Sequence, residues 1–234
     1  MIEKILNKEY IENLGYEVDE LADRIFLIKN FLSEKETNSL VNYGKSATQE
    51  DWEGHYMEGA RSIAKLKFGR DDIENLIAEG LFEITPTWVD KSYKIPDSNL
   101  VNSISERAQK IFNFKDNLNF NGCATLQRQY EGVPLVDHVD DHTDNSLEYA
   151  AVFYLNNDYT GGEIYFVHKN IELRPEPGSL LVFPASNDWR HGVREVGPGP
   201  HRYVIASFIS RKNFWQIHEQ NGYNVDKTLN DTKS

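Results

Sequence analysis

Apolar residues are spaced differently in the two halves of the chain, and the first half, up to about Asn119, is predicted to be mostly helical. Apolar positions there recur every three or four residues, the spacing of an amphipathic helix. A capping box at Ser33 and Glu36 marks the start of one helix, because each side chain can bind a free backbone amide of the first turn. The other predicted helices cover residues 2–14, 71–82 and 99–114, and a strand is predicted at 24–31.

From Gly122 onward the pattern changes to short β-rich runs separated by turns. Asn157-Asp158, Gly161-Gly162 and the two proline- and glycine-containing stretches at 175–178 and 197–200 provide the turn residues. Many short strands without helices between them favour a closed or double-sheet antiparallel fold, of which the jelly roll is the common example. The predicted strands are CATLQRQY, YAAVFYLN, EIYFVH, SLLVFP and RYVIASFI.

The length and composition fit one domain with an ordinary core, because 39% of the 234 residues are hydrophobic and 12% are aromatic. The predicted fold class is therefore mainly β with flanking helices: a double-stranded β-helix (jelly roll) core packed on N-terminal helices. Within the single domain, 1–234, we expect residues 1–119 to be the mainly helical support. Residues 120–212 are expected to form the jelly-roll core, and 213–234 a polar tail.

The charge and the cysteine content exclude several classes of protein. A formal net charge of −12 disfavours binding to nucleic acids and to anionic membranes. The sequence has neither a long apolar run nor the apolar centre of a secretion signal, so we expect a soluble, cytoplasmic protein without a membrane partner. The lone Cys123 rules out an intramolecular disulfide and a cysteine-based zinc cluster, so any metal must be bound by histidines and carboxylates.

The stretch DHVDDHTDN contains candidate metal ligands. His138 and Asp140 are two residues apart, so in an extended chain their side chains project from the same face, about 6–7 Å apart. His191 is a candidate third ligand, and two histidines with one carboxylate leave coordination positions open on iron. His142 and Asp144 offer the same spacing, and the stretch also reads as a solvated acidic loop. A calcium site is disfavoured because the EF-hand spacing is missing.

Several motifs occur in an order typical of one enzyme family: QYEG, LVDHVD, FYLNNDY, GGEIYF, RPEPGSLLVFP, HGV and HRYVIASF. Taken together, residues 129–209 resemble the catalytic core of the prolyl-hydroxylase-like branch of the iron(II)/2-oxoglutarate dioxygenases. An upstream IFLIKNFLSEKETNSLVNY is similar to the strand and helix that precede the core in that family. In the family a longer loop separates the first metal histidine from the Tyr-Leu-Asn strand, which favours His138 and Asp140 over the second pair.

The resemblance also implies a site for the cosubstrate 2-oxoglutarate. Arg202 is the candidate partner of its far carboxylate, since a guanidinium binds a carboxylate with two parallel hydrogen bonds. Tyr154 would add a hydroxyl to the same carboxylate, and Tyr130 matches a family tyrosine near the metal-binding end. The interval from Tyr130 to His138 is short and the interval from His191 to Arg202 is long for the family, which puts the role of Tyr130 in more doubt than the metal ligands.

Neighbouring residues have less specific roles in this hypothesis. Thr125 and Gln127 are candidates to line the pocket, and Phe208 is expected to pack in the barrel wall. Trp189 either shapes the substrate mouth or belongs to the core.

The implied cofactors are Fe(II), 2-oxoglutarate and O2, with ascorbate as an optional reductant. The implied reaction hydroxylates a C–H bond while 2-oxoglutarate is converted to succinate and carbon dioxide. A peptidyl proline in a peptide or protein substrate is the leading hypothesis, and a free amino acid or small metabolite is the alternative. Phe208 stands where nucleic-acid demethylases have a second arginine, which disfavours a nucleic-acid substrate. A non-catalytic jelly-roll protein that binds a metal or ligand, or a structural interaction domain, is the rival class, and the oligomeric state is left open.

Overall fold

The capping box at Ser33 begins a helix, α2 (Glu34–Ser46), in the computed structural model of the chain. The structure describes residues 5–48, 51, 54–56, 88–129, 131–132, 134–140 and 147–211. Two further helices are α1 (Lys8–Asn13) and α4 (Ser98–Phe112), which begin at the N-caps Asn7 and Asp97. The helices predicted to begin at Ser33 and to cover 99–114 are therefore confirmed. The helix predicted at the start of the chain is present as α1 and is shorter than predicted. The predicted helix at 71–82 and the polar tail lie outside the described residues.

The described strands form two antiparallel sheets. The larger sheet has the order β1-β2-β11-β8-β13-β6-β4-β3, with β5 paired to one end of β13, and the smaller has the order β10-β9-β12-β7. The strands of the larger sheet are β1 (Val18–Ala22), β2 (Ile25–Ile28), β3 (Gly54–Tyr56), β4 (Trp88–Lys94), β5 (Leu118–Phe120), β6 (Thr125–Gln129), β8 (Leu147–Tyr154), β11 (Leu180–Pro184) and β13 (Arg202–Arg211). Those of the smaller sheet are β7 (Leu135–His138), β9 (Ile164–Phe166), β10 (Ile171–Leu173) and β12 (His191–Val193), the last preceded by a 3-10 turn, η2 (Asn187–Trp189).

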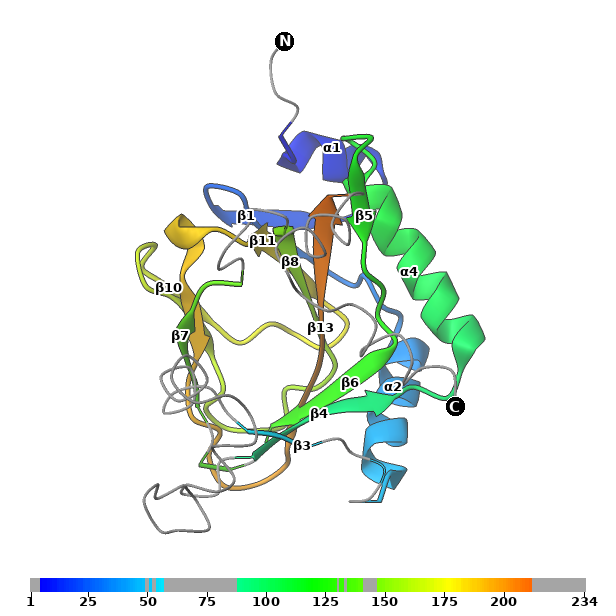
Figure 1. Cartoon of the computed structure of the whole chain (residues 1–234), viewed down its shortest axis with the longest axis vertical. Coiled ribbons are helices and arrows are strands. Elements are labelled where there is room, and N and C mark those ends of the chain that lie inside the picture. Colours follow the sequence, from blue (N-terminus) through cyan, green and yellow to red (C-terminus); the bar gives the residue numbers. More distant parts are fainter. Residues whose placement is uncertain are drawn as a thin grey trace, which may run out of the picture.

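Two hydrophobic clusters lie on opposite faces of the larger sheet, because successive side chains of a strand point to opposite faces. On β8, Ala151 and Phe153 belong to the cluster that includes residues of α2 and α4, whereas Ala150 and Tyr154 belong to the cluster shared with the smaller sheet. Figure 1 shows α2 and α4 on one side of the molecule, and β7 and β10 on the other. This arrangement confirms the predicted jelly-roll core with flanking helices.

The first half of the chain contributes more strand than the sequence predicts. The strand predicted at 24–31 is present as β2, but β1, β3, β4 and β5 were not predicted. β1 pairs with β2, and β4 pairs with β6, so these strands extend the larger sheet at both ends. Their apolar alternation is too weak to recognise in isolation, because strand formation there depends on packing and pairing with the neighbouring strands. None of the helices in the described residues is long and apolar enough to cross a membrane.

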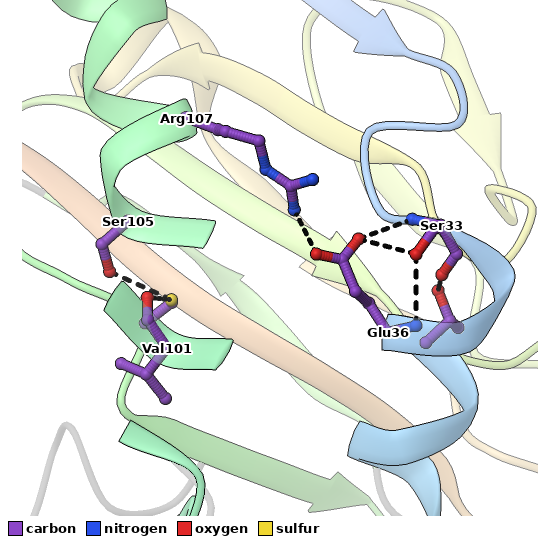
Figure 2. A network of polar contacts seen from close by, with 7 residues as sticks. Ser33, Glu36, Val101, Ser105 and Arg107 are labelled. Carbon is purple, nitrogen blue, oxygen red and sulfur yellow. Dashed lines mark hydrogen bonds and ion pairs between the residues drawn. The ribbon is translucent and has the colours of Figure 1, made fainter. Parts of the chain in front are cut away.

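A polar network ties α2 to α4 on the helical side of the larger sheet (Figure 2). The carboxylate of Glu36 accepts hydrogen bonds from the backbone N–H of Ser33 at 2.8 Å and from its hydroxyl at 2.9 Å. The same carboxylate accepts a hydrogen bond from Nη2 of Arg107, on α4, at 2.8 Å. Burial acts to raise the pKa of Glu36, but the hydrogen bonds from Ser33 and Arg107 outweigh it and leave that pKa below its usual value.

We expect the substitution Glu36→Gln to lower the free energy of unfolding at pH 7 by about 1–2 kcal/mol, because charge-assisted hydrogen bonds are lost. A carboxyl group with a depressed pKa in the folded state stabilises the fold above its unfolded pKa of 4.5 and loses that contribution as the pH falls. The difference between the parent and the variant should therefore shrink below pH 4.5. Urea denaturation across this pH range measures it. Glu34→Gln, at the exposed start of α2, is the matched control, and an equal loss there would contradict the assignment.

Candidate metal centre and its cavity

The pairing of β7 with β12 places two of the predicted ligands opposite each other. His138 is the last residue of β7, His191 is the first of β12, and the two are direct cross-strand partners. Directly opposite residues project from the same face of a sheet, and the two imidazole rings have centroids 4.5 Å apart. Asp140 follows two residues after His138, beyond the end of β7. The sheet thus brings together residues that are 53 positions apart in the chain.

The three side chains form a compact set of possible metal ligands. Each of His138, Asp140 and His191 offers one ligand atom, and these atoms all lie within 4.8 Å of one another. Nε2 of His138 is 3.5 Å from Oδ1 of Asp140, and Nε2 of His191 is 3.8 Å from Oδ2. Oδ2 of Asp140 is buried and has no hydrogen bond to any residue that the structure describes. A buried carboxylate oxygen without a partner is costly unless a cation or a donor joins it, so the set fits a divalent metal ion.

The ring of His191 is held in the orientation that a metal ligand requires. Nδ1 lies 3.1 Å from the carbonyl oxygen of Trp189, and because a carbonyl only accepts, Nδ1 carries the proton and Nε2 keeps its lone pair. The ring of Phe183 packs edge-on against it, with the centroids 4.5 Å apart. Burial lowers the pKa of His191, although Asp140 acts in the opposite direction. The neutral imidazole, which is the form that binds metals, is therefore favoured.

An ion pair on the outer face of the smaller sheet joins the residues that precede the two histidines. Nε of Arg190 is 2.5 Å from a carboxylate oxygen of Asp137, and its Nη2 donates to the backbone oxygen of Asp137 at 2.9 Å. Gly192, on the other side of His191, also fits closely: a Cβ atom there would lie 2.8 Å from the backbone oxygen of Leu135. These contacts hold β12 against β7 in the register that faces both histidines inward. The sequence carries a signal for the pair, since opposite charges directly precede the two histidines.

A cavity of about 470 Å³ lies between the two sheets and is lined by all three candidate ligands. This volume is within the usual range for small-molecule sites. Most of the other lining residues are apolar, from both sheets, and the polar ones outside the ligand set are Gln127, Tyr154, Arg202 and Ser207. Gln127 lines this space as predicted, whereas Thr125 is not among the described lining residues. Phe208, which was predicted to pack in the barrel wall, also lines the cavity. Trp189 is only 3% exposed and packs in the core between the sheets.

Arg202, the first residue of β13, brings a buried cation to the cavity. Its side chain is 5% exposed, and its Nη1 donates to Oε1 of Gln129 at 3.2 Å. Nε has no hydrogen-bond partner, and no carboxylate among the described residues forms an ion pair with this guanidinium. A buried guanidinium without a counter-ion is unfavourable. The cavity therefore carries a site suited to an anion, in addition to the set of metal ligands.

Two tyrosine hydroxyls accompany this guanidinium. The guanidinium carbon of Arg202 lies 5.3 Å from the ring centroid of Tyr154, and the hydroxyls of Tyr154 and Tyr159 are both buried without a hydrogen-bond partner. Burial raises the pKa of Tyr154 to about 12, although Arg202 acts to lower it. The Tyr154 hydroxyl is thus protonated at neutral pH and can donate to an anion. Tyr159 was not predicted as a site residue, because nothing in its turn sequence distinguishes it from a core tyrosine.

The side chain of Asn156 fixes the start of β13, where Arg202 lies. Its Oδ1 accepts a hydrogen bond from the backbone N–H of Tyr203 at 2.7 Å, and its Nδ2 donates to the backbone oxygen of His201 at 2.8 Å. Arg202 is therefore bracketed by two backbone hydrogen bonds from one buried amide. Of the remaining predictions, Tyr130 and the alternative ligand pair, His142 and Asp144, lie outside the described residues.

Comparison with known proteins identifies a family model that matches part of the chain. Residues 125–210 match the family model of the 2OG-Fe(II) oxygenase superfamily. The match covers less than half of the chain, and over this part the sequence is similar to that superfamily. The superfamily is one of oxidoreductases, and the matched region runs from β6 to the end of β13, so it contains strands from both sides of the cavity.

Individual relatives agree with the family but are distant. A stretch of 68 residues is 32% identical to prolyl 3-hydroxylase 1 of Gallus gallus, and it covers 27% of this chain and 9% of that protein. The fold is similar to that of a viral collagen prolyl hydroxylase from Paramecium Bursaria Chlorella virus-1, with 16% identity and a TM-score of 0.54 over 81% of this chain and 97% of that chain. It is also similar to a prolyl-4-hydroxylase from Pseudomonas putida, with 16% identity and a TM-score of 0.50 over 87% of this chain and 97% of that chain. At this identity the two structures show a shared fold.

The Arg190–Asp137 pair beside the candidate ligands leads to a prediction. Removal of partners that orient metal ligands from outside the coordination shell typically lowers metal affinity by about 10- to 100-fold. We expect Asp137→Asn to weaken binding of Mn²⁺ about three- to tenfold, at or below the low end of that range because both side chains are half-exposed. Anaerobic calorimetric titration measures the affinity. Glu172→Gln removes an equally exposed ion pair, with Arg194, on the same sheet and is the control. Equal Mn²⁺ affinities for all three proteins would refute the orienting role.

Proposed function

We propose that the chain is an Fe(II)- and 2-oxoglutarate-dependent oxygenase that hydroxylates a peptidyl proline. One observation carries this proposal: a single cavity is lined both by the set His138, Asp140 and His191 and by the buried cation of Arg202, which has no counter-ion among the described residues. The first group is suited to an iron ion and the second to a carboxylate. A dicarboxylic cosubstrate that chelates the metal at one end needs both in the same cavity.

The chain's own residues have distinct tasks in the proposed reaction. His138, Asp140 and His191 would bind the iron and leave coordination positions free. Arg202 and Tyr154 would bind the far carboxylate of 2-oxoglutarate through charge-assisted hydrogen bonds and so orient its keto-acid end. The bound metal, 2-oxoglutarate and O2 supply the oxidising chemistry, with succinate, carbon dioxide and the hydroxylated product as the outcome. The apolar walls around the ligands, including Phe183 and Val193, exclude water from the reacting atoms.

The lining of the cavity favours a residue within a peptide over a free amino acid. A free amino acid carries an ammonium and a carboxylate, and each needs a charged or strongly polar partner when it is desolvated. Apart from the candidate ligands and Arg202, no charged side chain is among the described residues that line the cavity. The ring of a peptidyl proline is uncharged and fits such walls. The names of the similar structures, a collagen prolyl hydroxylase and a prolyl-4-hydroxylase, point to the same substrate class.

The test is a measurement of succinate release by the Fe(II)-loaded protein with 2-oxoglutarate and O2, with and without ascorbate, against proline-containing peptides and free proline. We expect turnover with peptides and the addition of one oxygen atom to a proline, seen by mass spectrometry. The variants His138→Ala, Asp140→Ala and His191→Ala should fall to background, because each removes a ligand. His168→Ala, at an exposed turn, should keep full activity.

The outcomes separate the rival functions. Turnover of free proline but not of peptides would replace the proposed substrate class with a free amino acid. No succinate from any substrate, even uncoupled, would favour a non-catalytic binding protein. Loss of activity in His142→Ala with activity retained in His138→Ala would overturn the proposed choice of ligands.

Replacement of Arg202 should act on the cosubstrate rather than on the metal. We expect Arg202→Gln to raise the KM for 2-oxoglutarate at least tenfold, since a charge-assisted contact contributes about 1.5–3 kcal/mol. The affinity for Mn²⁺ should stay within about twofold of the parent, because Arg202 is not a ligand. Arg194→Gln, in an exposed ion pair with Glu172, is the matched arginine control. An unchanged KM in Arg202→Gln would refute this role.

A further inference from the structure

Three buried polar atoms that have no hydrogen bond within the described residues gather at the anion site: Nε of Arg202 and the hydroxyls of Tyr154 and Tyr159. Each buried polar atom without a partner costs about 1–3 kcal/mol, so three in one place require an explanation. Arg202 and Tyr154 line the cavity, whereas Tyr159 is not among the lining residues and is 2% exposed. The proposed cosubstrate therefore provides a partner for the Tyr154 hydroxyl but none for the Tyr159 hydroxyl.

The backbone of a tight turn places Tyr159 beside the side chain of Arg202. Gly162 has a φ of +68°, and a Cβ atom there would lie 2.8 Å from the ring of Tyr159 and 3.2 Å from Cδ of Arg202. Only glycine leaves room for the ring and the arginine stem to meet at this point. Cδ is bonded directly to Nε, so Tyr159 lies near the Nε side of the guanidinium. Arg202 also lowers the pKa of Tyr159 against the larger effect of burial, as expected for a neighbouring cation.

Tyr159 is also fixed from its other side. Nη1 of Arg174 donates to the backbone oxygen of Tyr159 at 2.7 Å, and the guanidinium carbon of Arg174 lies 5.7 Å from the ring centroid. A residue that is buried, anchored by its backbone and packed on a glycine has little freedom to turn its hydroxyl elsewhere. Arg202 and Arg174 both lower the pKa of Tyr159, and the effect of Arg202 is the larger of the two.

We propose that Tyr159 is a positioning residue for Arg202, whose Nε donates to the Tyr159 hydroxyl and whose Nη atoms are thereby aimed into the cavity. This inference rests on the proposed function, because it concerns how the far carboxylate of 2-oxoglutarate is bound. A guanidinium can present a carboxylate with either its Nε and one Nη or its two Nη atoms. Pairing of Nε with Tyr159 leaves the end-on fork of two Nη atoms for the cosubstrate. Gln129, which accepts from Nη1 at 3.2 Å, would give way to the stronger, charged acceptor.

The experiment measures binding of 2-oxoglutarate to the Mn²⁺-loaded, anaerobic protein by calorimetry in a double-mutant cycle. Tyr159→Phe keeps the ring that packs on Gly162 and removes only the hydroxyl. We expect it to raise the Kd for 2-oxoglutarate about fivefold, the effect of one net hydrogen bond of about 1 kcal/mol. Affinity for Mn²⁺ should not change. Arg202→Lys keeps a charged group but has no Nε–H at that position, so adding Tyr159→Phe to it should change the Kd by less than about twofold.

The controls and the contrary results are distinct. Tyr16→Phe removes a half-buried hydroxyl that belongs to the helical side of the molecule, and it should bind 2-oxoglutarate as the parent does. A parent-like Kd in Tyr159→Phe would overturn the inference. An equal loss in the parent and in the Arg202→Lys variant would also overturn it, because Tyr159 would then act independently of Nε. If the parent itself does not bind 2-oxoglutarate, the proposed function fails, and this inference fails with it.

Discussion

The antiparallel pairing of β7 with β12 is the interaction on which the whole candidate site depends. Side chains alternate between the faces of a strand, so a slip of one residue would turn His191 to the outside while His138 stayed inside. Three contacts oppose such a slip: the Arg190–Asp137 pair, the close fit of Gly192 and the pairing of His191 with Phe166 on the neighbouring strand β9. The two histidines, from distant parts of the chain, are therefore positioned by the pairing of two strands, and Asp140 follows just beyond the end of β7.

The walls of the cavity carry two buried charges of opposite sign. A carboxylate oxygen without a hydrogen bond, on Asp140, and a guanidinium without a counter-ion, on Arg202, are both buried in the walls of one cavity. Neither neutralises the other, since no ion pair forms between them within the described residues. Each buried, unpaired charge destabilises the folded chain, and a bound ion of opposite charge would remove this destabilisation. Unsatisfied charges of opposite sign in one cavity are thus a physical description of a site for a metal and an anionic chelator.

Local patterns in the sequence predicted part of this arrangement, such as the capping box of α2 and the alternation of β8, β11 and β13. The roles of the predicted ligands and cosubstrate contacts remain predictions, but the structure places five of these residues in the lining of one cavity: His138, Asp140, His191, Arg202 and Tyr154. The contacts of Asn156 with the start of β13, and of Tyr159 with Arg202, could not be predicted, because they form only after β8 and β13 have paired. The strands β1 and β4 likewise owe their order to β2 and β6. In each case the information lies in the pairing of two segments, and neither segment contains it alone.

The two hydrophobic clusters differ in size and in whether they adjoin the cavity. This difference explains how the fold accommodates a cavity between its sheets. The cluster on the helical side contains large side chains from α2, α4 and the larger sheet that fill their space, including Leu40, Phe112 and Phe153. The cluster between the sheets is smaller and adjoins a cavity, so it forfeits contacts that close packing would provide. The two clusters share β8, β11 and β13, whose alternate residues belong to one or the other. Tyr154 and Arg202 face the cavity from β8 and β13, and the opposite face of these strands packs in the cluster on the helical side. This packing holds the strands in place, so the site does not need a filled cavity to keep its shape.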